Sequence, residues 1–376
     1  MKKTVLLLLC VVLLCSLWGC KQTPESPAVD PPGESEESSI GKMLCGVMAL
    51  RCELQNANND TVAVSDGTAV VFGVVENAAY LVTNFHVVYN SFSADADRPI
   101  CGVIKAAPYG AESSEGVAAE CIWFSKEYDL AVLYVENVTE SFPGITVPNI
   151  DASVTPLVAE EIFVIGNTEG AGIALHRGNI SRALEKVTIP VEYSFFDISL
   201  HLIRYDAAVN KGDSGGAVFA ANGSLLGIAN ARRKDNAGGY AIPTSTVLPI
   251  VSQVIAAHSA KAEDVSARAL RFGVSIDEVA IKTEYDEATR LPKTSYELRV
   301  TELEIGSVGA IFLAKGDVLL GVNRNGSELP LARSLQLTDL LNQCAAGDTL
   351  IWRYRRGESE LTYEITVSSL QLQDIK

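Results

Sequence analysis

The chain contains 376 residues with a mass of 40.2 kDa, a length that favours two folded domains at roughly 100–200 residues each. Its composition is 48% hydrophobic and 20% charged, which supplies packed cores and excludes a collagen-like or wholly disordered protein. The formal net charge of −16 repels phosphate backbones and argues against a nucleic-acid-binding protein.

The N-terminus predicts an exported, lipid-anchored chain. Lys2 and Lys3 precede an apolar run over residues 5–14, typical of a secretory signal and shorter than the about 20 residues that span a bilayer. The run is followed by Leu-Trp-Gly-Cys at 17–20, which resembles a bacterial lipobox, although Trp18 is bulkier than the usual residue. We predict a signal peptide over 1–19 and a diacylglycerol on Cys20, in the extracytoplasmic cell envelope. The alternative is an ordinary signal peptide with an incidental cysteine.

Residues 20–42 are rich in Pro, Ser and Glu and predict a disordered tether, because they offer little to bury. Beyond Cys20 the chain has five cysteines, and export permits disulfides among them. Local spacing makes Cys45–Cys52 and Cys101–Cys121 conceivable pairs and leaves the pairing open. The fifth is Cys344. Neither a CxxC motif nor a Cys/His cluster is present, so we predict no metal site.

Two β-rich bodies follow the tether. Residues 43–260 contain short apolar or alternating runs that are broken by turn residues, a pattern that predicts a sandwich or barrel. Examples of these runs are residues 69–75, 80–82, 130–135, 162–165 and 225–228. A helix is expected over 244–257 and a polar hinge over 261–264. A second body is expected over 265–370, with strands at 298–303, 318–322, 350–354 and 361–367. Its helix over 334–344 places Leu337, Leu340, Leu341 and Cys344 on one face.

Three short segments, 83–88, 128–133 and 210–216, carry the candidate chemistry. A serine hydroxyl needs an adjacent base to act as a nucleophile, imidazole can take its proton near neutral pH, and a carboxylate fixes the imidazole tautomer. The chain supplies His86, Asp129 and Ser214 in the chymotrypsin-like order rather than the subtilisin or α/β-hydrolase order. Each residue alone has an ordinary structural reading, as a half-buried histidine, a turn aspartate or a turn serine. Together they predict a catalytic triad.

The glycines around the serine predict an oxyanion hole. Backbone N–H groups that converge on one point need conformations open chiefly to glycine. We expect Gly212, Asp213 and Ser214 to supply the donors, and Gly215 and Gly216 to permit close approach of the substrate.

The first body resembles a trypsin-like serine protease of the HtrA/Deg family. The resemblance rests on the triad segments, on Ile-Gly-Asn at 165–167, Gly-Asn-Ile-Ser at 178–181, Tyr-Asp-Ala-Ala-Val-Asn at 205–210, Gly-Ile-Ala-Asn at 227–230 and Tyr-Ala-Ile-Pro at 240–243. It implies a mostly-β fold with a chymotrypsin-like double β-barrel, serine endopeptidase activity without a cofactor, and a homotrimer. The segment between Asp60 and Gly67 is short, which argues against a long loop that could build a larger cage.

The second body resembles a single, circularly permuted PDZ domain, with a generic accessory domain as the alternative. The segment Leu270, Arg271, Phe272, Gly273 and Val274 stands where the family binds a peptide's C-terminal carboxylate while the peptide adds a strand. Lys-Gly-Asp at 315–317 and Gly-Asp at 347–348 also match, whereas Ile-Phe at 311–312 replaces the usual Ala-Gly. The resemblance further implies that PDZ occupancy switches the protease site.

Asp213 stands where family members often have Asn. We hypothesise that it finds another donor or a cation, with Lys211 and Arg232 as candidates, and that this partner orders the oxyanion hole. The substrate pocket is expected at Ala208, Val209 and Ile228. Without a carboxylate such a pocket favours aliphatic side chains, and discrimination by a methylene amounts to only about 1–3 kcal/mol.

These observations predict an envelope endopeptidase that degrades or processes misfolded or regulatory proteins by acyl-enzyme chemistry. Its partners would be unfolded substrates, C-terminal peptides at the PDZ domain and a membrane reached through the lipid. The alternatives are a peptide-sensing chaperone whose protease site is normally closed, and an esterase that uses the same triad. Neither the physiological substrate nor the activating peptide follows from the sequence.

Overall fold

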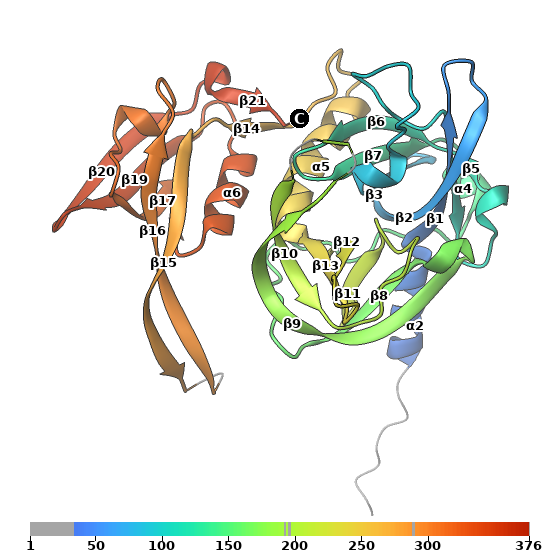
Figure 1. Cartoon of the computed structure of the whole chain (residues 1–376), viewed down its shortest axis with the longest axis horizontal. Helices are drawn as coiled ribbons and strands as arrows, with labels where there is room; N and C mark the ends of the chain where they lie inside the picture. Colours follow the sequence, from blue (N-terminus) through green and yellow to red (C-terminus); the bar gives the residue numbers. More distant parts are fainter. Residues whose placement is uncertain (1–33, 192, 195–196, 288–289, 376) are drawn as a thin grey trace, which may run out of the picture. The chain divides into compact units, whose positions relative to one another are not determined.

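The computed structural model describes residues 34–191, 193–194, 197–287 and 290–375 (Figure 1). The predicted signal peptide, Cys20 and the tether up to residue 33 lie outside these residues. The predicted tether is wrong for its last part, because helix α2 spans Glu34–Cys45. Its sequence contains no proline and several good helix formers, and Met43 near its end is buried. Among the described helices, we find none with the length and apolarity of a membrane span.

The first sheet has seven antiparallel strands in the order β5-β4-β1-β2-β3-β7-β6. The strands are β1 Val47–Gln55, β2 Thr61–Val75, β3 Ala78–Thr83, β4 Val103–Pro108, β5 Val117–Ala118, β6 Glu120–Ser125 and β7 Leu130–Val135. Apolar side chains of β1, β2, β3 and β7 form one buried core. Residues 61–67 belong to β2 and pair with β1, with Leu50 opposite Gly67. The segment between Asp60 and Gly67 is therefore strand, so its shortness says nothing about a loop.

The second sheet closes into a six-stranded barrel in the order β10-β13-β12-β11-β8-β9, drawn in green and yellow in Figure 1. Its strands are β8 Glu161–Asn167, β9 Ile173–Ile189, β10 Ile198–Tyr205, β11 Ala217–Ala220, β12 Leu225–Arg232 and β13 Gly239–Pro243. Helix α5 follows over Thr244–Ser259, as predicted. Short helices α3 Phe85–Val88 and α4 Val138–Ser141 and 3₁₀ turns at Ser113–Glu115 and Thr168–Gly170 complete this part.

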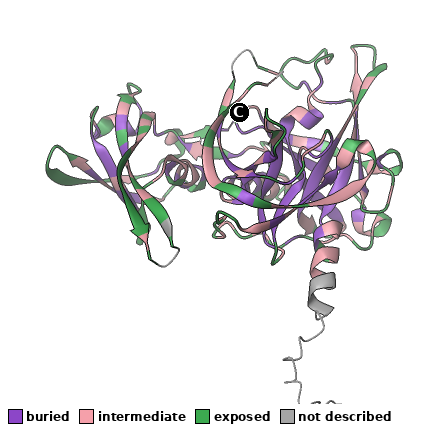
Figure 2. Ribbon diagram, turned by 60° about the horizontal axis from the view of Figure 1, so that its bottom comes forward, coloured by how far each residue is buried: buried purple, intermediate pink, exposed green. Residues whose placement is uncertain are grey.

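The C-terminal body contains a sheet in the order β15-β16-β17-β19-β20, a separate pair of β14 with β21, and the predicted helix. Its elements are β14 Arg268–Leu270, β15 Val274–Asp286, β16 Leu291–Leu303, β17 Val318–Arg324, β18 Ser327–Pro330, α6 Ser334–Gln343, β19 Thr349–Arg356, β20 Ser359–Thr366 and β21 Leu372–Asp374, with 3₁₀ turns at Gly309–Ile311 and Ser369–Gln371. Buried residues concentrate in the strands of the first two sheets, whereas much of the β15–β16 hairpin is exposed (Figure 2). The predicted mostly-β fold is confirmed.

The five cysteines that the structure describes are free thiols. Cys52, Cys101 and Cys121 belong to the core of the first sheet, and the Cys52 thiol hydrogen-bonds that of Cys101. Burial raises the pKa of the Cys121 thiol to about 12. Neither of the two pairs suggested by spacing is joined, because tertiary contacts rather than chain separation decide which thiols meet.

Candidate active site

His86 and Asp129 meet because their strands pair. β3 ends at Thr83, directly before the short helix α3 that carries His86, and Thr83 lies opposite Ala131 at the start of β7. Asp129 therefore comes beside His86. The His86 ring Nδ1 lies 2.7 Å from Asp129 Oδ2, and the His86 backbone N–H donates to Oδ1 at 2.9 Å. Asp129 is a non-glycine residue with a φ of +51°, a left-handed conformation that costs strain and is held by these contacts.

Neutral donors complete the surroundings of Asp129, which is only 2% exposed. The Asn230 amide donates to Oδ2 at 2.7 Å, and the Asn84 amide donates to the Asp129 backbone carbonyl at 3.1 Å. A carboxylate can only accept, so the His86 proton lies on Nδ1 and leaves Nε2 as a base. No motif in the sequence indicates this role of Asn230, because its contact depends on the bend of β12, where the pairing with β13 shifts register between Ala229 and Ala231.

Tyr193 is a second neighbour of Asp129 that the sequence did not indicate. Its ring packs edge-on against Phe85 at 4.8 Å between centroids, and its hydroxyl donates to the Lys126 carbonyl at 3.3 Å. Burial and then the charge of Asp129 raise the pKa of Tyr193 well above its usual value. The tyrosine therefore stays neutral and covers this side of the carboxylate.

Ser214 is placed by the backbone of a glycine-rich turn. Gly212 and Gly215 have φ values of +93° and +81°, and a Cβ on Gly215 would lie 2.1 Å from the Thr68 carbonyl oxygen. The Thr68 N–H donates to the Ser214 carbonyl at 2.9 Å. The Ser214 hydroxyl donates to the Asn230 carbonyl at 3.3 Å. Asn230 thus contacts the nucleophile candidate through its backbone and Asp129 through its side chain.

The predicted oxyanion hole needs one correction. The Asp213 N–H donates to the Asn210 carbonyl at 3.2 Å, because the chain forms a tight turn here, so this donor is already used. In the part of the chain that the structure describes, the N–H groups of Gly212 and Ser214 have no acceptor. The Gly212 carbonyl is held by the Thr68 hydroxyl at 2.7 Å, which fixes the peptide plane between Gly212 and Asp213. Two of the three expected donors remain available.

Asp213 finds neutral donors rather than either of the two candidate cations. The Asp213 carboxylate is fully buried and accepts from the Thr168 hydroxyl and the Asn210 N–H, each at 2.7 Å. The Thr168 oxygen also lies 2.9 Å from His176 Nε2, and since its own proton goes to Asp213, the histidine donates. Neutral donors replace the expected Lys211 or Arg232, because the end of β8 carries Thr168 to this position.

The three residues expected to line the substrate pocket differ in how far they are buried. Ala208 is exposed, Val209 is partly buried against the core of the closed barrel, and Ile228 is fully buried within β12. Ile228 pairs with Ala217 and Ile242 on its two sides, which places it inside the barrel wall. Of the three, Ala208 and Val209 reach the surface.

In the predicted peptide-binding segment of the C-terminal body, backbone groups rather than side chains are available to bind a peptide. Leu270 and Phe272 are core residues, and Phe272 stacks on Trp352 at 4.3 Å between centroids. The Arg271 N–H is used, since it donates to the Gln371 carbonyl at 2.9 Å. Gly273 has a φ of +64°, and the following strand β15 lies at the edge of its sheet. An edge strand presents unpaired backbone groups to which an extended peptide can pair.

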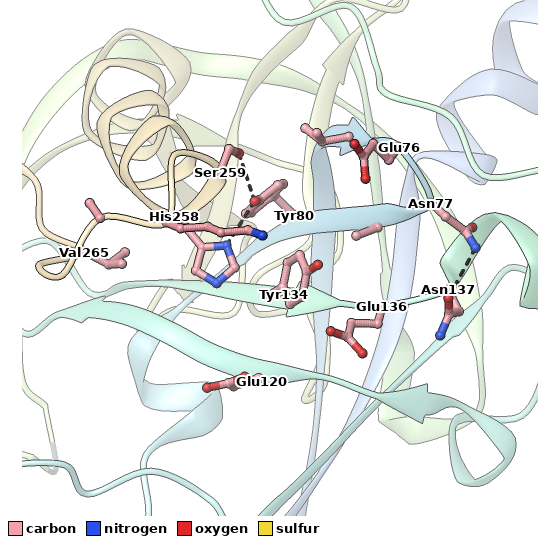
Figure 3. Close-up of a pocket in the computed structure, with 14 residues that line it drawn as sticks. Glu76, Asn77, Tyr80, Glu120, Tyr134, Glu136, Asn137, His258, Ser259 and Val265 are labelled. Carbon is pink, nitrogen blue, oxygen red and sulfur yellow. Dashed lines mark hydrogen bonds between the residues drawn. The ribbon is translucent and has the colours of Figure 1, made fainter.

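A separate pocket of about 800 Å³ lies at the β2–β3 turn and the end of α5 (Figure 3). The Tyr80 hydroxyl lies 3.0 Å from His258 Nδ1 and 2.9 Å from the Ser259 hydroxyl there. None of the predicted site residues lines it. Within the described ranges we also find no group of three or more His, Cys, Asp or Glu side chains that could hold a metal ion.

Comparison with known proteins agrees with this geometry. Residues 67–228 match the family model of the trypsin-like peptidase domain. The chain is 27% identical over 339 residues to the chloroplastic Protease Do-like 8 of Arabidopsis thaliana, covering 85% of this chain and 69% of that protein. It is 32% identical over 192 residues to the periplasmic serine endoprotease DegP of Salmonella typhimurium, covering 49% and 35% of the two chains. A solved structure of the HtrA-type protease AlgW with a tripeptide aligns with a TM-score of 0.59 and 22% identity, covering 90% of this chain and 97% of that one.

Proposed function

The chain is a trypsin-like serine endopeptidase with a chymotrypsin-like double β-barrel, and we propose that Ser214, His86 and Asp129 carry out its reaction. The observation that supports this most strongly is the 2.7 Å contact of His86 Nδ1 with the buried Asp129 carboxylate. Asn230 links this carboxylate to the nucleophile candidate, because its amide donates to Asp129 and its carbonyl accepts from the Ser214 hydroxyl. These residues come from three separate segments of the sequence, and a structural turn alone would not need them together.

The proposed reaction begins when His86 Nε2 takes the Ser214 hydroxyl proton as the oxygen attacks the scissile carbonyl. Asp129 stabilises the imidazolium that forms. The Gly212 and Ser214 N–H groups hold the oxyanion, after which His86 returns the proton to the leaving amine. Water then hydrolyses the acyl enzyme by the same route, with no cofactor.

We further propose that residues 265–370 are a PDZ domain that binds C-terminal peptides. Support comes from the free edge of β15 and from Glu278 on this strand, which accepts from the Ser334 N–H at 2.6 Å and so holds the N-terminus of α6 beside it. The N–H groups of Phe272 and Gly273 would receive the peptide carboxylate. Peptide occupancy would then raise protease activity.

Substrates, assembly and location belong to the same proposal. Similarity to proteases named Do-like, HtrA and periplasmic DegP supports protein substrates and an extracytoplasmic location. A homotrimer and lipid attachment at Cys20 stay predictions. Unfolded or regulatory envelope proteins would be the natural substrates, because the pocket residues impose little selectivity.

The test compares the purified full-length chain with its Ser214→Ala variant on unfolded casein, with and without peptides that end in apolar residues. We expect cleavage by the wild type only, with stimulation by the peptides. Cleavage that persists in the variant would refute the role of Ser214. Absence of cleavage under every condition, with suppression of casein aggregation, would favour the chaperone alternative. A preference for short acyl esters over casein would favour the esterase.

A further inference from the structure

Three consecutive cations lie at the end of β12, which has Arg232 as its last residue and is followed by Arg233 and Lys234. They line a cleft of about 290 Å³ together with Tyr240 and the end of β9. The whole chain has a net charge of −16, so this is a local positive region on an acidic protein. Arg232 was a candidate partner for Asp213, but that carboxylate receives neutral donors instead, so Arg232 has no part in the oxyanion turn.

The cleft begins next to the nucleophile candidate. The Ser214 hydroxyl donates to the carbonyl of Asn230 at 3.3 Å, and the next residue, Ala231, already lines the cleft. The pairing of β12 with β13 shifts register between Ala229 and Ala231, so the strand bulges at Asn230. An extended peptide rises about 3.3 Å per residue. A substrate bound at Ser214 therefore reaches the cleft within about four residues of the cleaved bond.

Within the part of the chain that the structure describes, one of the three cations is neutralised by an ion pair. Arg233 forms an ion pair with Asp235 and donates to the Ala237 carbonyl at 3.1 Å, so it holds the turn after β12. Arg232 and Lys234 are exposed, and no described residue forms an ion pair with either of them. Two unpaired cations at the wall of a cleft attract a carboxylate, by a modest amount because water screens both partners.

We propose that this cleft is a subsite for an acidic substrate side chain, so that the protease prefers Asp or Glu within about four residues of the scissile bond. The proposal rests on the proposed peptidase function and adds the substrate chemistry. It explains how a strongly acidic enzyme can accept acidic substrates, because the local charge beside the nucleophile opposes the charge of the rest of the chain.

The test uses matched peptides with an aliphatic residue at the cleavage position and Glu, Gln or Lys at each of the four positions on either side. We expect Glu to raise kcat/KM over Gln by about 3–10-fold at one position, mainly through KM, and salt to reduce this advantage. The double variant Arg232→Gln/Lys234→Gln should lose the preference, so that its ratio of kcat/KM for the Glu peptide to that for the Gln peptide falls to about one. Arg290→Gln/Lys293→Gln, an exposed pair at the β15–β16 hairpin, is the matched control and should keep the preference.

A second measurement separates this proposal from the proposed function. Binding of the same peptides to the full-length Ser214→Ala variant, followed by fluorescence anisotropy, does not depend on turnover. Binding of the Glu peptide about 3–10-fold more tightly than the Gln peptide supports the subsite even if the wild type cleaves neither. Equal binding of the two, or a preference that survives Arg232→Gln/Lys234→Gln, overturns the subsite even if cleavage by Ser214 is established.

Discussion

The protease body and the C-terminal body hold their buried carboxylates in opposite ways. Asp129 and Asp213 are at most 2% exposed and receive amide, hydroxyl, imidazole and backbone donors. In the C-terminal body the equally buried Asp317 receives the Arg356 guanidinium at 2.7 Å, and the partly buried Asp348 receives that of Arg324 at 2.8 Å.

The difference fits the role proposed for Asp129. A fixed cation beside Asp129 would cancel the negative charge that stabilises a developing imidazolium, whereas neutral donors orient the carboxylate and leave its charge available. No such role is proposed for Asp317. An arginine can therefore neutralise its charge and link the start of β17 to the end of β19. We therefore expect changes in the protease body to affect rate first and changes in the C-terminal ion pairs to affect stability first.

The largest effect is expected for Asp129→Asn. The amide would present a donor to His86 or fix the wrong tautomer, and kcat/KM should fall by about 10⁴-fold while the fold is kept. Steady-state kinetics and a thermal melt measure the two properties. Asp151→Asn, at an exposed carboxylate that caps a turn at Ser153, is the control. A loss below tenfold would mean that Asp129 does not orient the base.

The sequence predicted residues whose role is set by local chemistry. His86, Asp129 and Ser214 stand in motifs whose order and flanking glycines indicate them directly, and α5 and α6 follow from apolar periodicity. These features depend on neighbours in the chain or on a motif that restricts the fold.

Contacts between residues that are distant in the chain could not be predicted from the sequence, because they depend on how the strands bend and pair. Asn230 reaches Asp129 because β12 bulges, and Thr168 reaches Asp213 from the end of β8, 45 positions away in the chain. Among the described residues neither candidate cation, Lys211 or Arg232, forms an ion pair with Asp213, because the Thr168 hydroxyl and the Asn210 N–H donate to it instead. Phe272 keeps its backbone place in the proposed binding loop, and only the packing against Trp352 shows that its side chain belongs to the core.

The next effect in size is expected for Gly212→Ala. A Cβ there would lie 2.1 Å from the Asn167 carbonyl oxygen, and the φ of +93° disfavours any L side chain. The turn would have to shift and misplace an oxyanion donor, which lowers kcat by about 100–1000-fold. Gly144→Ala is the control, because a Cβ there meets nothing within 4 Å. Equal activity of the two variants would exclude Gly212 from the oxyanion hole.

A smaller effect is expected for Thr168→Val. The change removes the hydroxyl that donates to Asp213 and leaves a buried charge with one donor fewer, which corresponds to about a tenfold loss in kcat with little change in KM. Thr168→Ser should restore the rate, because it keeps the hydroxyl. An unchanged kcat in the valine variant, with a lowered Tm, would make this contact purely structural.

The smallest effect concerns acid stability of the C-terminal body. Burial works to raise the pKa of Glu278, but hydrogen bonds from Ser334 and the charge of Arg333 outweigh it and lower the pKa below its ordinary value of 4.5. A carboxyl with a lowered folded pKa contributes stability above its ordinary pKa and loses it as the pH falls through the folded pKa. Glu278→Gln should therefore lower Tm by about 1–3 °C at neutral pH, with the difference from wild type shrinking below about pH 4.5. The control is Glu360→Gln, at an exposed position of β20, which should show no such pH dependence. If the difference in Tm between Glu278→Gln and wild type stays constant down to acid pH, packing rather than the charge of Glu278 holds β15 beside α6.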